Sequence, residues 1–201
     1  MEDVLAYSMD EEWGRYLPVP QPYTRRFGEE YLARCVLTDW GKHPVFAVVL
    51  GGKVVGGIDL YVDTTNNIAE LGYSISQNHW GKGLTLEAAT VVIDWGFRTF
   101  GLAKVFAGGG ALNRRSWRVM EKLGMKREGL LRSHRLVRGE RTDEVVYGVL
   151  REEWCAKQQT RRSCAWPKTS LAELLFETVG ELPRQVRGHR VRIRISHGSN
   201  A

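Results

Sequence analysis

The chain has no apolar run that approaches the ~20 residues of a membrane-spanning helix, although 43% of its 201 residues are hydrophobic. Its acidic start, Met1-Glu2-Asp3, lacks the basic and apolar pattern of a signal peptide. The three cysteines, Cys35, Cys155 and Cys164, are odd in number and lack metal-ligand spacing, and the five histidines are scattered. We therefore expect a globular cytoplasmic protein with reduced thiols and no bound metal.

Excess charge is also absent from most of the chain. Residues 1–154 hold 20 Lys and Arg against 20 Asp and Glu, so the formal charge of +6 comes entirely from residues 155–201. A solvated extension is the ordinary explanation of such a basic tail. Contact with RNA or another anionic surface is the alternative.

The segment 77–88 is rich in glycine, follows an alternating apolar stretch and opens a long helical pattern. This order predicts a strand, a turn and a helix start whose first amides lie outside the helix ladder. The helix dipole favours an anion there, and Gly81 and Gly83 admit a pyrophosphate closely. A plain strand-to-helix turn is the alternative. Walker A would need Ser or Thr at Gly83, and a dinucleotide fingerprint would need glycine near Leu86.

Several motifs around this loop occur together in one known family. The pattern Asn78-x-x-Gly81-x-Gly83 is similar to the acyl-CoA loop of GNAT acetyltransferases, Gln/Arg-x-x-Gly-x-Gly/Ala, with Asn78 in the first slot. Further segments resemble its ribosomal-protein N-acetyltransferase branch, the RimJ/RimL-like enzymes, over about residues 2–154: Ala69–Tyr73, Asn113–Ser116, Glu121–Met125, Arg127–Gly129, Asp143–Gly148 and Arg151–Trp154.

The resemblance implies a mixed α/β fold, with two central parallel strands that splay apart around the pantetheine arm of acetyl-CoA. Family members usually open with a strand before the first helix, and this chain begins inside that helix. We expect a GNAT domain at 1–154 and a basic extension at 155–201, with a short helix near 170–182 and a strand at 190–196. That strand alternates, so it can add to the open sheet edge of the same chain or of a second copy in a homodimer.

Acetyl transfer needs a base for the amine and an acid or hydrogen-bond donor for the leaving thiolate. Glu70 is the candidate base because it lies on the less apolar face of its strand; a surface carboxylate paired with an arginine is the alternative. Ser116 is the candidate acid, one helical turn from Asn113, which is also a catalytic candidate and suits an N-cap. Many relatives carry Tyr where Met120 stands. Tyr147 is another candidate acid, with core packing as the alternative.

The resemblance also assigns contacts to the substrates. It places acetyl-CoA on Tyr73, Ser74, Ile75, Asn78, Trp80, Gly81, Lys82, Gly83, Leu84, Thr85, Asn113 and Ser116, with the amide near Ile75 holding the acetyl oxygen. Trp13, Tyr16 and Tyr23 flank a proline-containing loop where the family admits acceptors. These three aromatic residues either shape the acceptor pocket or cover the core.

We expect an acetyl-CoA-dependent N-acetyltransferase that acts on a primary amine by direct transfer. At pH 7, deprotonation costs ~1 kcal/mol for an α-amine and ~4.6 kcal/mol for a lysine, so one carboxylate base favours a protein N-terminus. A ribosomal protein is one such acceptor. The alternatives are a small-molecule amine (an amino acid, polyamine or antibiotic) and a non-catalytic acyl-CoA-binding module. The latter is favoured by the absent first strand and by Gly108–Gly110, which we expect to loosen the cleft.

Overall fold

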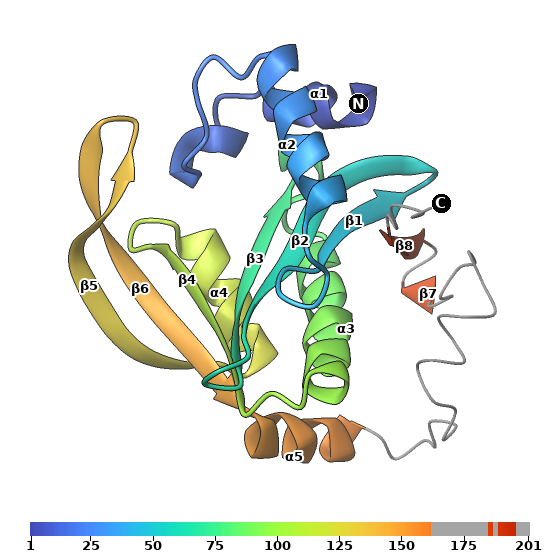
Figure 1. The fold of residues 1–201 in the computed structure, drawn as a ribbon, viewed down its shortest axis with the longest axis vertical. Coiled ribbons are helices and arrows are strands. Elements are labelled where there is room, and N and C mark those ends of the chain that lie inside the picture. The colour runs from blue at the N-terminus through green and yellow to red at the C-terminus, as the bar shows by residue number, and fades with distance from the viewer. Residues whose placement is uncertain (162–184, 187–188, 196–201) are drawn as a thin grey trace.

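The structure is a computed structural model that describes residues 1–161, 185–186 and 189–195, with side chains through residue 158. A mixed sheet runs through it in the order β5-β6-β4-β3-β2-β1-β8-β7 (Figure 1). Its strands are β1 (Val45–Leu50), β2 (Lys53–Asp63), β3 (Ile68–Ile75), β4 (Lys104–Gly110), β5 (Lys126–Val137), β6 (Glu140–Leu150), β7 (Gln185–Val186) and β8 (His189–Ile195). The mixed α/β fold that the sequence predicts is confirmed.

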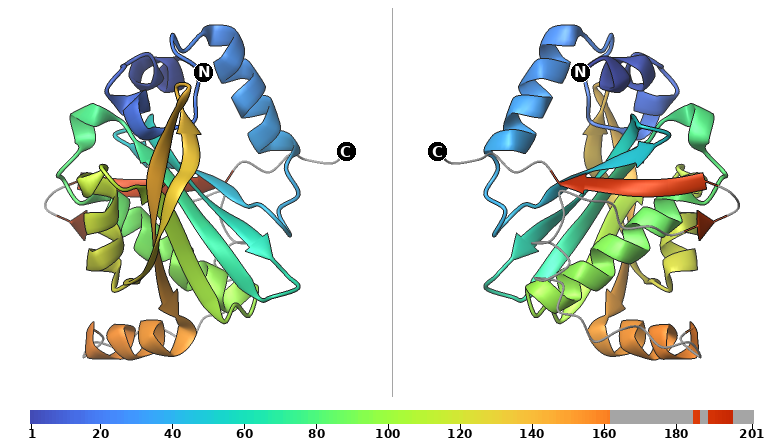
Figure 2. Two further views of the ribbon diagram at one scale, coloured as in Figure 1. Left: turned by 90° about the vertical axis from the view of Figure 1, so that its left-hand side faces the viewer. Right: turned by 90° about the vertical axis from the view of Figure 1, so that its right-hand side faces the viewer.

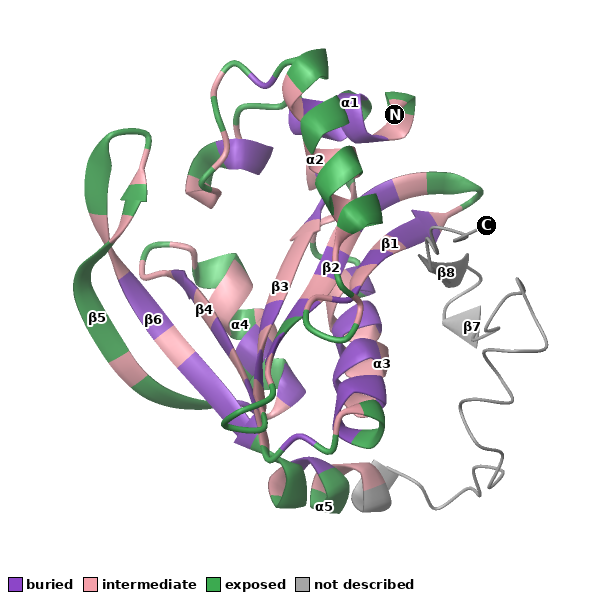
Figure 3. Ribbon diagram, in the orientation of Figure 1, coloured by how far each residue is buried: buried purple, intermediate pink, exposed green. Residues whose placement is uncertain are grey.

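Helices lie on both sides of the sheet (Figure 2). They are α1 (Glu2–Ser8), α2 (Arg25–Leu37), α3 (Leu84–Thr99), α4 (Arg114–Leu123) and α5 (Arg151–Arg161), with the 3-10 helices η1 (Trp13–Tyr16) and η2 (Gln77–His79). The main core lies between the sheet and helices α3 and α4. A second, smaller core joins α1, η1 and α2. Figure 3 shows the buried faces of α3 and of the central strands in purple.

Strand β3 divides its side chains between these two sides. Ala69, Leu71 and Ile75 are buried in the main core. Glu70 alternates with them and therefore lies on the opposite face of the sheet. One face of β3 therefore lies in the apolar core, and the face that carries Glu70 lies in a more polar environment.

Strands β3 and β4 are parallel and pair over only three residues, the last pair being Glu70 and Phe106. Beyond that point β3 continues alongside β2 as far as Ile75, and β4 continues alongside β6 as far as Gly110. The facing edges of β3 and β4 therefore have backbone groups outside the sheet ladder, which need other partners. This is the splayed pair of strands that the sequence predicts.

The glycines at 108–110 form the second half of β4 and pair with β6 through Gly110. A Cβ on Gly108 would lie 2.1 Å from a carboxylate oxygen of Glu144. A Cβ on Gly109 would lie 3.3 Å from Ser116 Oγ. The glycines therefore let side chains from neighbouring elements close over this strand.

Strand β8 pairs antiparallel with β1, from Phe46 opposite Ile195 to Leu50 opposite Val191. It corresponds to the strand expected at 190–196, and it occupies the sheet position beside β1 that the sequence analysis left open. The helix expected near 170–182 lies outside the described residues. The boundary expected between residues 154 and 155 falls inside α5.

Deleting residues 162–201 should lower the melting temperature by about 4–8 °C, roughly 2 kcal/mol for a chain of this size. The reason is the loss of β8, whose five register pairs with β1 satisfy an edge. Calorimetry measures the shift, and hydrogen exchange should show protected amides at 191–195. Deleting only 196–201 is the matched control. An unchanged melting temperature with fast exchange at 191–195 would instead favour a basic arm that contacts RNA.

The remaining expectations about compartment and metal concern particular residues. None of the helices in the described ranges combines the length and hydropathy needed to cross a bilayer. Cys35 and Cys155 are free thiols, and Cys164 lies outside the described residues. Within the part of the chain that the structure covers, no group of three or more His, Cys, Asp or Glu side chains is arranged to hold a metal ion.

Candidate active site

The turn between β3 and α3 has the backbone that its glycines predict. Gly81 and Gly83 have φ values of 75° and 82°, a left-handed conformation that favours glycine. No atom outside the neighbouring residues lies within 4 Å of a Cβ built on either, so the turn is open. Glu87 donates its amide to Gly83 O at 3.0 Å, which leaves the amides of residues 84–86 outside the ladder of α3. This geometry suits an anion at the helix start.

Trp80 fixes the turn to the two elements beside it. Its indole Nε1 donates to the carbonyl of Ile75 at 2.7 Å, at the end of β3. The guanidinium of Arg115 on α4 lies 4.6 Å from the centre of the Trp80 ring. Burial and the nearby Lys82 lower the pKa of His79, so this imidazole is neutral at pH 7 and adds no charge to the turn.

Tyr73 and Ser116 meet across the opening between the splayed strands. The Tyr73 hydroxyl donates to Ser116 O at 3.0 Å and lies 3.0 Å from Ser116 Oγ. Burial raises the pKa of Tyr73 to about 12, so the phenol keeps its proton at neutral pH. Asn113 caps α4, its Oδ1 accepting from the Ser116 amide at 3.2 Å. The N-cap interpretation of Asn113 is correct, and the cap holds Ser116 in place.

The sequence reasoning placed Tyr73 at the acetyl-CoA site but missed its pairing with Ser116. The two residues are 43 positions apart, and only the tertiary fold brings them together. Strand alternation gave part of the information, because it puts Tyr73 on the same face as Leu71 and Ile75, toward the helices.

The other acid candidate, Tyr147, lines a cavity of about 560 Å³ together with Trp117 and Glu121 of α4. Tyr147 is buried on β6, and its hydroxyl donates to Glu121 Oε1 at 3.4 Å. Burial and the Glu121 carboxylate raise the pKa of Tyr147. Met120, which stands where many relatives carry Tyr, is fully buried beside Gly109. The packing of Tyr147 agrees with its interpretation as a core aromatic.

Glu70 lies on the opposite face of the sheet from Tyr73, with 44% of its side chain exposed. Burial raises the pKa of Glu70, the Arg135 guanidinium lowers it, and the Glu144 and Asp59 carboxylates raise it further. Arg135 Nη2 is 3.9 Å from Glu70 Oε1. The structure therefore shows the arginine pairing that the alternative interpretation of Glu70 predicted, and the role of Glu70 as a base stays a prediction.

Of the three aromatic residues assigned to the acceptor, two are packed in the second core. Trp13 and Tyr23 are buried and meet edge to face, with ring centroids 5.9 Å apart. Tyr16 lies next to the end of β4, where its ring is 3.7 Å from a Cβ built on Gly110. Tyr16 is therefore the one of the three that reaches the splayed strands.

A cavity of about 440 Å³ lies between α2 and β2. This cavity was not predicted from the sequence. Its polar lining includes His43 Nε2, which is 2.7 Å from Asp59 Oδ2. Asp59 stands opposite Gly72 on β3 and shares the face of Glu70. Burial raises the pKa of Cys35 in the same cavity, which argues against a thiolate nucleophile there. An aspartate among the apolar residues of β2 was the available sequence signal.

The family model of the acetyltransferase (GNAT) domain matches residues 1–126 of this chain. The chain belongs to this family and is a GNAT N-acetyltransferase of the RimJ/RimL-like type. It is 33% identical to the N-acetyltransferase YnaD of Bacillus subtilis, over 75% of this chain and 88% of that protein. It is 34% identical to the N-acetyltransferase p20 of Bacillus licheniformis, of which the match spans only 52%.

A solved structure agrees with this fold. The GCN5-related N-acetyltransferase of Brucella melitensis superimposes with a TM-score of 0.71 and 26% identity, covering 86% of this chain and 84% of that one. A spermidine N-acetyltransferase of Vibrio cholerae, solved with CoA and spermine, has a TM-score of 0.65 and covers 77% and 91% of the two chains. Its identity is 19%, so this likeness concerns the fold alone.

The relatives differ in the acceptors that their names give. The ribosomal protein uS5-alanine N-acetyltransferase of Escherichia coli is 34% identical over 42% of this chain and 43% of that protein. The spermidine N(1)-acetyltransferase of the same organism is 22% identical over 78% and 79%. One acts on a protein and the other on a polyamine, so family membership leaves the acceptor open.

Proposed function

We propose that this chain transfers the acetyl group of acetyl-CoA directly to the α-amine at a protein N-terminus. The observation that carries the proposal is the splay of β3 and β4, with the Gly81–Gly83 turn at its end. The turn supplies open amides for the pyrophosphate, and the free strand edges supply partners for the pantetheine amides. Acetyl-CoA is the donor that GNAT enzymes use, and the features of this chain fit its shape and charge.

The two faces of β3 divide the chemistry. The amine attacks the thioester carbonyl, and Glu70 accepts its proton on the face that carries Asp59 and Glu144. The thiolate leaves on the face of α4, where the Ser116 hydroxyl, backed by Tyr73, donates a hydrogen bond or a proton. In this assignment the base and the acid act from opposite sides of one strand.

The α-amine is the preferred acceptor because its deprotonation at pH 7 costs about 1 kcal/mol, against about 4.6 kcal/mol for a lysine. A site with a single half-exposed carboxylate supplies only part of the larger cost. The uS5-alanine N-acetyltransferase supports a ribosomal protein as the acceptor, since the name of that relative specifies an alanine of such a protein.

A small polycationic amine is the second candidate, favoured by one feature of the structure. Three carboxylates lie on the acceptor face of the sheet, namely Glu70, Glu144 and Asp59. The charges of Glu144 and Asp59 both raise the pKa of Glu70. An acidic face attracts a cation such as a polyamine. The spermidine N(1)-acetyltransferase among the relatives supports the same class.

The reasons for a non-catalytic acyl-CoA-binding module have physical explanations in the structure. β8 occupies the sheet edge beside β1, and the glycines of β4 make room for side chains. Neither feature removes a group that acetyl transfer needs. Turnover of acetyl-CoA in the presence of an amine separates the enzyme from the binding module.

The acceptor assay uses matched amines. One peptide has a free N-terminal alanine and no lysine, and its partner has a blocked N-terminus and one lysine. Spermidine and free alanine complete the set. We expect the highest kcat/KM for the free N-terminus, with the added 42 mass units located on the first residue. Preference for spermidine would replace the first proposal with the second, and absence of turnover with every amine would favour the binding module.

Ser116→Ala and Tyr73→Phe should each lower kcat about 10- to 100-fold, the range in which a positioned proton donor contributes. The dissociation constant of acetyl-CoA should change little. The double variant should be no slower than the worse single variant, because the two hydroxyls act as one unit.

Tyr147→Phe is the matched control, since it removes a buried hydroxyl from the same core without touching this pair. Equal loss in Tyr147→Phe and full activity in Ser116→Ala would move the acid role to Tyr147. Steady-state kinetics and calorimetry separate the effects on kcat and on binding.

A further inference from the structure

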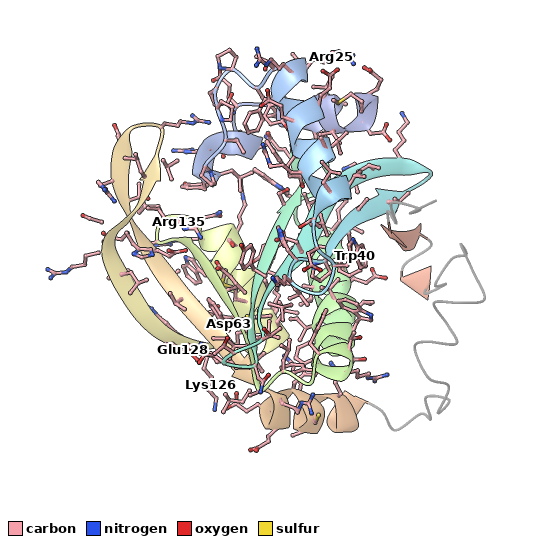
Figure 4. The ribbon with its side chains drawn as sticks, in the orientation of Figure 1. Arg25, Trp40, Asp63, Lys126, Glu128 and Arg135 are labelled. Carbon is pink, nitrogen blue, oxygen red and sulfur yellow. The ribbon has the colours of Figure 1, made fainter. Side chains whose placement is uncertain are left out.

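Glu144 is a buried carboxylate that lies near Glu70 and has its polar partners on β5. It is 5% exposed on β6. Arg135 Nε on β5 donates to Glu144 Oε1 at 2.6 Å, and His134 Nε2 lies 3.5 Å from the other oxygen. The outer nitrogen of the same guanidinium, Nη2, is 3.9 Å from Glu70 Oε1. One arginine therefore stands between two carboxylates. Figure 4 labels Arg135 on the β5–β6 hairpin.

The backbone of β4 is adapted to this cluster. A Cβ on Gly108 would lie 2.1 Å from Glu144 Oε1 and 3.4 Å from Arg135 Nη2, so any larger residue would displace the carboxylate from its present position. Gly108 follows Phe106, the register partner of Glu70, by two residues and therefore shares the face of Glu70. A buried ion pair is a poor source of stability, because desolvation offsets its attraction. A fold that makes room for such a pair beside a base candidate suggests a functional use.

We infer that Arg135 and Glu144 are positioning residues for Glu70, with Glu144 holding Arg135 so that its outer nitrogen orients Glu70. The inference rests on the proposed role of Glu70 as the base. Neither residue needs to touch the acceptor. Glu144 fixes the arginine, and the arginine acts on Glu70.

The charged and titratable groups around Glu70 come from several strands. Tyr61 and Asp59 stand on β2, the first directly opposite Glu70. On β4, Phe106 is the register partner of Glu70, and the Lys104 ammonium lies 5.8 Å from the centre of the Phe106 ring and pairs with Glu128. Among the charges, the arginine lowers the pKa of Glu70, whereas Glu144 and Asp59 raise it. Removing the arginine therefore raises the pKa of Glu70. Removing the charge of Glu144 has two opposed effects, because it deletes a neighbouring negative charge and also releases the arginine that Glu144 holds. The coupling between the two residues, rather than the sign of one shift, tests the positioning role.

The test follows Glu70 directly by NMR, through the pH titration of its side-chain carboxyl carbon. The signal is assigned by its absence from Glu70→Gln. We expect the titration midpoint to move to higher pH in Arg135→Gln, with Arg135→Lys between that variant and wild type, because an ammonium cannot contact both carboxylates as the guanidinium does. Glu144→Gln should lower the midpoint more when Arg135 is absent than when it is present, because only in the second case does the change also release the arginine. Arg132→Gln, which removes an exposed arginine from the same strand, should leave the midpoint unchanged.

Steady-state kinetics provides the second test of the inference. In Arg135→Gln, kcat/KM at pH 7 should fall about tenfold, and the acidic limb of the pH profile should move with the NMR midpoint. A midpoint that stays fixed in Arg135→Gln, or an equal shift from Glu144→Gln with and without Arg135, overturns the inference. Midpoints that move while the acidic limb stays fixed support the inference and overturn the role of Glu70 as the base. If Glu144→Gln fails to fold, Arg135→Lys decides in its place, because 30% of this arginine side chain is exposed and a wild-type midpoint in that variant overturns the inference.

Discussion

Gly83→Glu should raise the dissociation constant of acetyl-CoA at least 100-fold, about 2.7 kcal/mol in binding free energy. Two effects add at this position. The residue has a φ of 82°, which is costly for any residue with a Cβ. The new carboxylate also stands at the start of α3, where the free amides and the helix dipole favour the negative pyrophosphate. Isothermal titration calorimetry with acetyl-CoA measures the change.

Gly139→Glu is the matched control, because Gly139 has the same φ of 82° and open space around it, but lies in the turn between β5 and β6. It carries the same strain and charge away from α3. Gly83→Ala separates the strain from the charge and should have an intermediate affinity. Unchanged affinity in Gly83→Glu would show that the pyrophosphate binds elsewhere.

Features set by neighbours in the sequence could be predicted from it. The turn at Gly81 and Gly83 depends on glycine conformation and on a helix start, both of which are local. The N-cap role of Asn113 is local as well, since its acceptor reaches an amide three residues away. The splay of β3 and β4 was predicted through the family motifs, because no local pattern reports where two parallel strands part.

Features that depend on tertiary register could not be predicted. Arg135 faces Glu144 and Glu70 only because the pairing of β5 with β6 shifts between Leu131 and Arg135. A one-residue change of register would turn the arginine to the other face of the sheet. The close approach of Glu144 to Gly108 depends on tertiary register as well, because Glu144 comes from another strand.

The aromatic residues near the N-terminus show a different limit. Trp13 and Tyr23 flank a loop where acceptors enter in related enzymes, yet both are buried in the smaller core with Tyr7. Their position in the sequence predicted the loop near which they lie, but it did not predict that their side chains point into the core. Burial decides between a pocket wall and a core residue, and only Tyr16 reaches the end of β4.

Glu70→Gln should lower kcat about 100- to 1,000-fold at pH 7, within the range attributed to a positioned general base. Glutamine keeps the size of the side chain and removes its ability to accept the proton. The acetyl-CoA loop lies beyond the end of β3, so the dissociation constant of acetyl-CoA should stay within about twofold, or about 0.4 kcal/mol. Kinetics with the free N-terminal peptide and calorimetry with acetyl-CoA measure the two effects.

The pH dependence of the rate distinguishes a base from a structural residue more clearly than the rate at pH 7 does. Burial raises the pKa of Glu70, so the wild-type rate should fall as the pH drops through that raised value, where the base takes up its proton. In Glu70→Gln the rate should instead rise toward high pH, because an α-amine with a pKa of about 7.8 loses its proton unaided there. The difference between the two enzymes should therefore narrow above about pH 8. Glu128→Gln, which breaks a surface ion pair with Lys104, is the control for loss of a carboxylate. A Glu70→Gln enzyme with the wild-type pH profile would assign Glu70 to a structural role and require another base on the acceptor face.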